Sequence, residues 1–254
     1  MKDRARPIRE HLREIRRRMM FTGVFFIGAL VVAFIFYEQI FRILLVPAGD
    51  AINPSTGGKL IFTSVTEAWS TVAKVGVIAA LVLTMPFLLF QVVMFLRPGL
   101  NPNERRMLYI LLPAGIISFA AGVTFSYFVL LPPAIRFLLN FGSDLFTPFI
   151  SATSYVSLIA LLMFWMGLIF EIPIAMYFLA RIGILRSRWL SRGRRWAYVI
   201  AFVLGAIITP TVDPVNQTLV AGPIIAMYEI GFWLTRFAEY MRARKAARLA
   251  SGPA

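Results

Sequence analysis

The segment VGVIAALVLTMPFLLFQVVMFL, residues 75–96, decides the fold, because none of its side chains carries a charge. As an α-helix it would rise about 33 Å, enough to cross the roughly 30 Å hydrocarbon core of a bilayer. Hydrophobic residues make up 59% of the whole chain, which is more than a water-soluble domain keeps off its surface. The sequence therefore predicts an integral membrane protein.

Five further apolar segments predict an all-α integral membrane protein with six transmembrane helices. The predicted spans are residues 19–37, 75–96, 107–131, 156–180, 196–208 and 215–233. No stretch between them is long enough for a separate soluble domain, so residues 1–254 are expected to form a single membrane domain.

The last two predicted spans are short. Residues 196–208 would give only about 20 Å of helix against a hydrocarbon core of about 30 Å. Asp213 followed by Pro214 is typical of an N-cap and a first helical residue, so the chain is expected to turn there and form a short hairpin.

Two regions outside the spans show amphipathic patterns. Residues 1–18 precede the first span, and Ile8, Leu12, Ile15 and Met19 recur at helical spacing, which predicts a cytoplasmic amphipathic arm lying along the interface. Residues 38–74 form the longest loop, with a turn at Asn53 between amphipathic flanks, where we expect short interfacial helices.

Basic residues set the predicted orientation. Of the 26 lysines and arginines, 22 fall in the N-terminal arm, the second loop, the fourth loop and the tail of residues 236–254. Short loops rich in such residues stay in the cytoplasm, so both termini are predicted to be cytoplasmic. This distribution explains the net charge of +14 without nucleic acid as a partner, and it favours contact with anionic membrane lipids.

Catalytic and metal-binding patterns are missing from the sequence. There is no cysteine and only one histidine, and no Walker A, His-Glu-x-x-His or nucleophile-elbow motif occurs. We therefore expect a protein that is not an enzyme and uses no cofactor or metal.

Glu171 is the most informative polar residue within a predicted span. A carboxylate midway along a transmembrane helix is costly unless it is paired, hydrated or protonated. It can be a structural hydrogen-bonding group or part of a polar site in a cavity. Gln91 of the second span is a candidate partner, although a glutamine in a helix bundle more often simply forms a hydrogen bond between helices.

Glu14 and Glu104 lie near the predicted cytoplasmic face. Glu104 stands three residues after Asn101, which predicts a capping box, and Glu14 stands four residues before Arg18, which predicts an ion pair. On so basic a face, however, two carboxylates are also among the few groups that can bind a cationic peptide, since a carboxylate matches a guanidinium bidentately.

Several motifs in this order resemble the TatC family, the multi-spanning receptor subunit of the twin-arginine protein translocase, across nearly the whole chain. The matching segments are HLREIR at 11–16, FLRPGL at 95–100, ERR at 104–106, FEIP at 170–173, the Arg194–Arg195 pair, Thr209–Pro210 with Asp213, Gln217, Pro223 and Tyr228–Glu229. One departure is SVTEAW at 64–69, where the family commonly has Ser-Pro before the glutamate.

The resemblance implies a receptor for twin-arginine signal peptides that assembles with single-span TatA-type and TatB-type partners, as homo- and hetero-oligomers, in the bacterial inner membrane. Such a complex exports folded proteins with the proton-motive force. The residues it implicates fall into three groups: Glu14, Glu104, Arg16 and Phe95 in signal-peptide binding; Glu171, Gln91 and Gln217 as intramembrane polar residues; and Pro210, Asp213 and Tyr228 in partner docking or structure.

Two other functions remain open from the sequence. A secondary transporter would fit Glu171 but predicts an internal repeat, and none stands out. A structural membrane scaffold would make Glu14 and Glu104 dispensable.

Overall fold

The computed structural model describes residues 8–47, 60–141, 150–209 and 213–250, and these residues are almost entirely helical. The α-helices are α1 (Ile8–Ile35), α2 (Tyr37–Leu45), α3 (Glu67–Leu96), α4 (Pro102–Phe125), α5 (Leu131–Asn140), α6 (Ala152–Phe170), α7 (Ile172–Ile182), α8 (Ser187–Ile208) and α9 (Pro214–Ala250). A 3₁₀ turn (Arg97–Gly99) joins α3 to α4, and a π-helical turn (Ser126–Leu130) joins α4 to α5.

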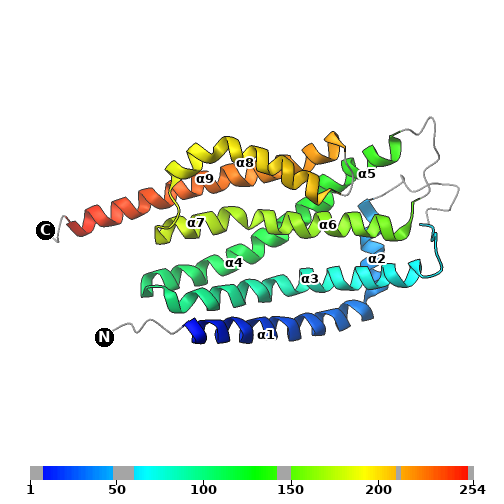
Figure 1. The fold of residues 1–254 in the computed structure, drawn as a ribbon, viewed down its shortest axis with the longest axis horizontal. Helices are drawn as coiled ribbons and strands as arrows, with labels where there is room; N and C mark the ends of the chain where they lie inside the picture. Colours follow the sequence, from blue (N-terminus) through cyan, green and yellow to red (C-terminus); the bar gives the residue numbers. More distant parts are fainter. Residues whose placement is uncertain (1–7, 48–59, 142–149, 210–212, 251–254) are drawn as a thin grey trace.

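The long helices run side by side along one axis (Figure 1). Helix α1 packs against α3, α4 packs against α6, and α9 packs against both α7 and α8. The start of α1 and the end of α9 lie at the same end of the molecule (Figure 1). Short α2 turns across the opposite end, where it leads from α1 towards α3.

Five helical stretches are long and apolar enough to cross a membrane. They are Leu12–Ile35, Glu67–Gly99, Glu104–Asn140, Ala152–Ile182 and Pro214–Arg244. The predicted all-helical membrane architecture is therefore confirmed at this level. Helix α8 is not among the five because its first half carries four arginines, and Arg186 directly precedes it, which lowers its mean hydropathy.

Several helices continue beyond the predicted spans. Residues 8–18 of the predicted arm and the first span form one element, since α1 runs unbroken from Ile8 to Ile35. Helix α3 begins at Glu67 rather than at residue 75. Helix α8 has 22 residues and begins at Ser187, so only its apolar half is short, not the helix itself.

The turn into α9 follows the sequence prediction. The Asp213 carboxylate accepts a hydrogen bond from the backbone N–H of Asn216 at 2.7 Å, and α9 begins at Pro214. Asp213 is therefore the N-cap, as predicted. Pro210 and the predicted turn at Asn53 lie outside the described residues.

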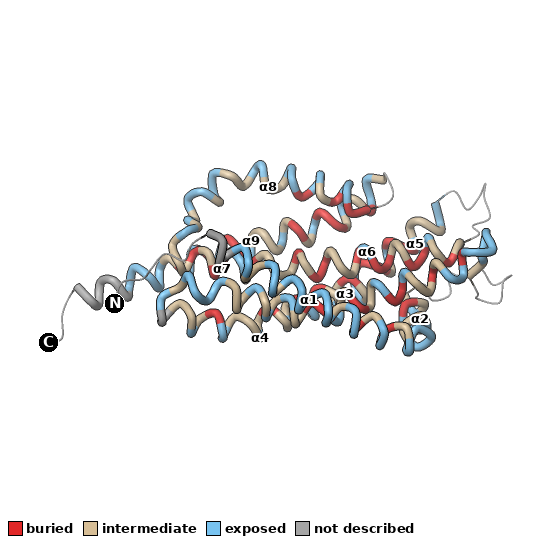
Figure 2. The backbone as a smooth tube through the Cα atoms, turned by 60° about the horizontal axis from the view of Figure 1, so that its bottom comes forward, coloured by how far each residue is buried: buried red, intermediate tan, exposed pale blue. Residues whose placement is uncertain are grey.

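Small residues allow the two central helices to approach closely. A side chain on Gly122 of α4 would place its Cβ 2.5 Å from the carbonyl oxygen of Met166 and 2.9 Å from the Cα of Gly167 on α6. Helices in membranes commonly associate through such contacts, because lipid offers no hydrophobic drive between them. Buried residues gather where the helices meet, whereas α1 and the outer face of α8 are largely exposed (Figure 2).

A buried carboxylate ties together two loops at the end of the bundle opposite the start of α1. One oxygen of Glu67 accepts hydrogen bonds from the backbone N–H and the hydroxyl of Thr63, and the other accepts from the Ser151 hydroxyl and the Thr153 N–H. Ile61 and Ser151 form a parallel bridge beside it. Glu67 thus holds the segment before α3 against the start of α6.

Substituting Glu67→Gln should loosen this end of the molecule. The amide has one acceptor oxygen instead of two, and hydrogen bonds to a charged group contribute about 1.5–3 kcal/mol each. We expect a lower Tm in detergent and faster proteolysis of the segment before α3. The control is Glu38→Gln, because Glu38 is exposed and its recorded hydrogen bond is to the neighbouring Tyr37; equal effects of the two substitutions would contradict the assignment.

Candidate functional site

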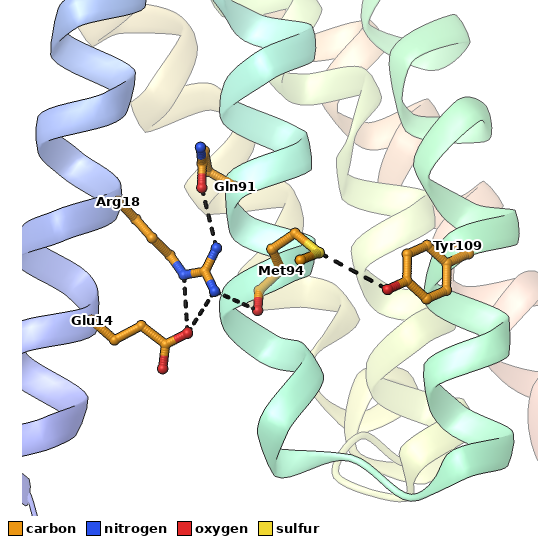
Figure 3. Close-up of polar contacts among 5 residues, drawn as sticks. All are labelled: Glu14, Arg18, Gln91, Met94 and Tyr109. Atoms are coloured by element: carbon orange, nitrogen blue, oxygen red, sulfur yellow. Dashed lines mark hydrogen bonds and ion pairs between the residues drawn. The ribbon is translucent and has the colours of Figure 1, made fainter.

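The N-terminal part of α1 presents a carboxylate that is already paired. Arg18 Nη2 lies 2.5 Å from Glu14 Oε1, and Arg18 Nε donates to the same oxygen at 3.2 Å (Figure 3). The two side chains are one helical turn apart, which is the spacing that brings i and i+4 residues together. Both are largely covered, with exposed fractions of 19% for Glu14 and 21% for Arg18, so the predicted ion pair is a shielded one.

Arg18 also joins α1 to α3. Its Nη1 donates to the Gln91 side-chain oxygen at 3.2 Å, and its Nη2 donates to the Met94 carbonyl at 2.9 Å (Figure 3). The Met94 sulfur in turn accepts a long hydrogen bond from the Tyr109 hydroxyl of α4 at 4.0 Å. One guanidinium therefore links the Glu14 carboxylate to the end of the α3–α4 hairpin.

Gln91 forms a hydrogen bond between helices, the more common role of a glutamine in a helix bundle, and is not the partner of Glu171. Gln91 binds Arg18, and no hydrogen bond joins it to Glu171 among the described residues. Residue spacing in the sequence places Gln91 on a helix but does not show which neighbouring helix its side chain contacts. The packing of α1 against α3 determines that contact.

Glu104 begins α4 at the same end of the bundle. The Asn101 backbone N–H donates to Glu104 Oε2 at 3.0 Å, and the two residues form the predicted capping box. Such a cap stabilises the α3–α4 turn and holds the carboxylate at the helix start, where the helix dipole favours negative charge.

The other two residues implicated in peptide binding flank these carboxylates. Arg16 is exposed on α1, and Phe95 is half-buried in the last turn of α3, next to Met94. Arg97 lies over the Tyr109 ring at 5.9 Å. The structure therefore brings Glu14 close to the end of α3 and places Glu104 across the short α3–α4 turn, on a surface otherwise rich in arginine.

Glu171 stands at the break between α6 and α7, two residues before Pro173. Its carboxylate lies against α4, where a Cβ on Gly115 would be 3.2 Å from Oε2. Within the described residues, Oε1 is enclosed and has no hydrogen-bond partner, while the Ser118 hydroxyl donates to the neighbouring Phe170 carbonyl at 2.7 Å. A hydrogen bond between α4 and this break is thus made through the Phe170 carbonyl, and Oε1 does not take part in it.

Polar contacts fasten α8 to α9 along their length. The Gln217 amide donates to the Phe202 carbonyl at 3.0 Å, and the Tyr228 hydroxyl donates to the Leu190 carbonyl at 2.7 Å. Gln217 and Tyr228 therefore have structural roles in this hairpin.

Two acidic residues of α9 contribute to the same hairpin: Glu229, which belongs to a motif noted in the sequence but without a predicted partner, and Glu239, which the sequence did not single out. Glu229 accepts from Arg194 at 2.6 Å and from the Tyr198 hydroxyl at 2.7 Å. Further along α9, Glu239 accepts from the backbone N–H and hydroxyl of Ser187 at the start of α8. A possible signal in the sequence was that each acidic residue interrupts an otherwise apolar or basic stretch of α9.

Comparison with known proteins decides the family. Residues 10–223 match the family model described as Sec-independent protein translocase protein (TatC). The chain belongs to the TatC family. It is 33% identical over 237 residues to the TatC protein of Carboxydothermus hydrogenoformans, covering 93% of this chain and 96% of that one, and 35% identical over 234 residues to that of Aquifex aeolicus, covering 91% and 95%.

A solved structure gives the same result in three dimensions. The crystal structure titled twin arginine translocase receptor TatC superposes with a TM-score of 0.80 at 34% identity, covering 90% of this chain and 99% of that chain. This TatC-family protein is therefore a core subunit of a protein translocase, not an enzyme, and a multi-pass protein of the bacterial inner membrane, as its long apolar helices require.

Removing the Arg18 guanidinium should weaken the attachment of α1 to α3. Arg18→Met breaks the contacts to Glu14, Gln91 and Met94 and leaves a largely covered carboxylate without that partner. A loss of about 1–3 kcal/mol is expected, measured as a lower Tm of the purified protein. Arg17→Met is the matched control, because exposed Arg17 only overlies the Phe21 ring at 5.5 Å. An unchanged Tm for Arg18→Met would show that the pair contributes nothing to stability.

Proposed function

We propose that this TatC-family protein is the receptor that binds twin-arginine signal peptides at its cytoplasmic face through Glu14 and Glu104. One observation carries the proposal: the Glu14 carboxylate is already held in a guanidinium contact at the end of the α3–α4 hairpin. A site that holds its own arginine there has the geometry and charge to hold an arginine of a ligand.

Exchange of the internal arginine for the ligand's arginine is physically reasonable. Arg18 keeps two other acceptors, the Gln91 side chain and the Met94 carbonyl, so its charge stays hydrogen-bonded if Glu14 turns to a ligand. Glu104 is near enough to the same turn to receive the second arginine, while Arg16 and Phe95 border the site. Arginine is preferred over lysine because its planar fork makes two parallel hydrogen bonds to a carboxylate.

The proposal includes six membrane crossings with both termini in the cytoplasm. Support comes from α8, whose 22 residues rise about 33 Å and which connects α7 to α9 along the bundle axis. Its apolar half can enter lipid while the arginines of its first half reach the cytoplasmic interface by extending their side chains. Five clearly apolar spans plus α8 also return α9 to the end at which α1 starts (Figure 1).

Because the chain has no cysteine, single-cysteine labelling tests this topology without a background. Val65→Cys and Val215→Cys should react with a membrane-impermeant maleimide from outside, and Gly99→Cys and Tyr240→Cys only after permeabilisation; all four positions are exposed. If Gly99 and Tyr240 reacted from opposite sides, the number of crossings between them would be odd and α8 would not span.

We infer further that α8 and α9 are where single-span TatA-type and TatB-type partners dock, in homo- and hetero-oligomers that move folded proteins with the proton-motive force. The exposed apolar face of α8, including Val199, Val203 and Ile207, supports a helix-docking role. Asp213 caps the start of α9 at the turn from α8, and Pro210, three residues earlier in the sequence, is assigned with it to this docking region. Glu171, with one enclosed oxygen lacking a hydrogen-bond partner in the described structure, is the carboxylate available for a polar group of a partner or for a proton.

Peptide binding tests the receptor function directly. A fluorescent signal peptide with two arginines should bind the purified protein at least about tenfold more tightly than the same peptide with two lysines, because a charged hydrogen bond contributes about 1.5–3 kcal/mol. Glu14→Gln and Glu104→Gln should each remove most of that preference.

Glu38→Gln serves as the control, since it removes an exposed carboxylate on α2, at the opposite end of the bundle. Photocrosslinks from positions 14 and 104 should likewise disappear with the lysine peptide. The proposal would be contradicted if the native protein bound both peptides equally, or if Glu14→Gln and Glu104→Gln both left the preference for arginine unchanged. The two glutamates would then serve only in ion pairing and helix capping, as in a structural scaffold.

A further inference from the structure

A half-enclosed pocket lies between α3, α5 and α6, near the end of the bundle opposite Glu14. Its volume is about 450 Å³, and its lining is mainly apolar, with Ile135, Leu138, Leu139, Leu158 and Leu161 among the lining residues. Pockets of this size are typical small-molecule sites when a few polar groups fix the orientation of the ligand. Here those polar groups are Lys74, Thr153, Ser154 and Ser157.

Lys74 supplies the only positive charge among the pocket's described lining residues. Its ammonium group donates to the Ser157 hydroxyl at 2.9 Å, and the Ser157 hydroxyl donates a hydrogen bond to the Thr153 carbonyl at 2.6 Å. An ammonium has three donors, so this bond accounts for one of them. No carboxylate within the described ranges forms a salt bridge with Lys74.

The depth of Lys74 fits a lipid head group. It is the eighth residue of α3, about 10 Å along the helix from Glu67. Trp69, between them, is 73% exposed, and exposed tryptophans mark the level of the head groups. A cation beside Ser157 at this depth, above an apolar pocket, matches a molecule with a negative head and hydrocarbon chains.

We propose that this pocket binds one anionic glycerophospholipid from the leaflet opposite the cytoplasm. The phosphate pairs with Lys74 and accepts a hydrogen bond from the Ser154 hydroxyl, while Ser157 holds the ammonium group of Lys74 in place. An acyl chain lies along Leu138, Leu158 and Leu161. The bound lipid joins the start of α3 to α5 and α6, where the helices leave an incompletely filled space. This site is independent of peptide recognition, which uses groups at the other end of the bundle.

The test uses the full-length protein in a neutral detergent, titrated with phosphatidylglycerol or with phosphatidylcholine of the same chains. Retained lipid is counted by native mass spectrometry, and Tm is measured in parallel. Phosphatidylglycerol should be retained preferentially and raise Tm. Lys74→Gln should reduce its retention at least about fivefold, the effect of one basic residue at a membrane surface, and Lys74→Arg should restore it.

Two further variants separate this site from general effects. Arg136→Gln removes another exposed cation, on α5, that is not among the pocket-lining residues, and should leave retention unchanged. Leu161→Trp fills the pocket from its exposed side and should reduce retention of phosphatidylglycerol while Lys74 is intact.

Three outcomes would overturn the proposal. If Lys74→Gln and Arg136→Gln reduced the retention of phosphatidylglycerol equally, the lipid would be held by general electrostatic attraction and not by this pocket. If phosphatidylglycerol and phosphatidylcholine were retained equally, the pocket would not recognise the negative charge of the head group. A photocrosslink from position 161 to a bound signal peptide that phosphatidylglycerol does not compete away would assign the pocket to the apolar segment of the peptide instead.

Discussion

The absence of water in the bilayer core is the constraint on which the rest of this structure depends. Every backbone N–H and carbonyl must find its partner within the protein, so each crossing segment must be helical, and any interruption requires a substitute partner. The break at Glu171 shows the rule at work. Pro173 cannot donate a hydrogen bond, and the Ser118 hydroxyl of α4 donates to the Phe170 carbonyl at the same break. The irregular point is tolerated because a neighbouring helix lies against it.

The same constraint explains why the polar side chains occur in pairs and near helix ends. Arg18 meets Glu14 and Gln91, Arg194 meets Glu229, and Glu67 collects the donors of two loops. Each contact joins segments that lipid alone would leave weakly associated, because lipid chains are as apolar as leucine. Polar contacts therefore define which helix lies beside which, and small residues such as Gly122 set how closely the helices approach.

Hydropathy predicted the apolar segments of the helices but not where the helices end. An apolar run records contact with lipid, whereas a helix continues until a cap or a turn residue stops it. The arginine-rich first half of α8 and the residues from Glu67 to Lys74 are helical without being apolar, so sequence assigned them to loops. Capping is local and was predictable, and both Glu104 and Asp213 act as expected. Partners across helices were not predictable, because they depend on helix rotation and packing. Gln91 meets Arg18 for this reason, Glu229 was noted only as part of a motif and without its partners, and Glu239 was missed.

The two ends of the bundle consequently differ in how firmly their carboxylates are held. Glu67 is enclosed by donors from backbone and hydroxyl groups that cannot move without unfolding two loops. Glu14 is instead held by a long arginine side chain that has two other acceptors to retain it. A carboxylate whose arginine partner can be replaced by a ligand at a small free-energy cost is suited to binding that ligand. A carboxylate held by backbone donors is suited to a structural role. The difference between these environments, rather than the presence of a glutamate, suits Glu14 to the proposed recognition role and Glu67 to a structural one.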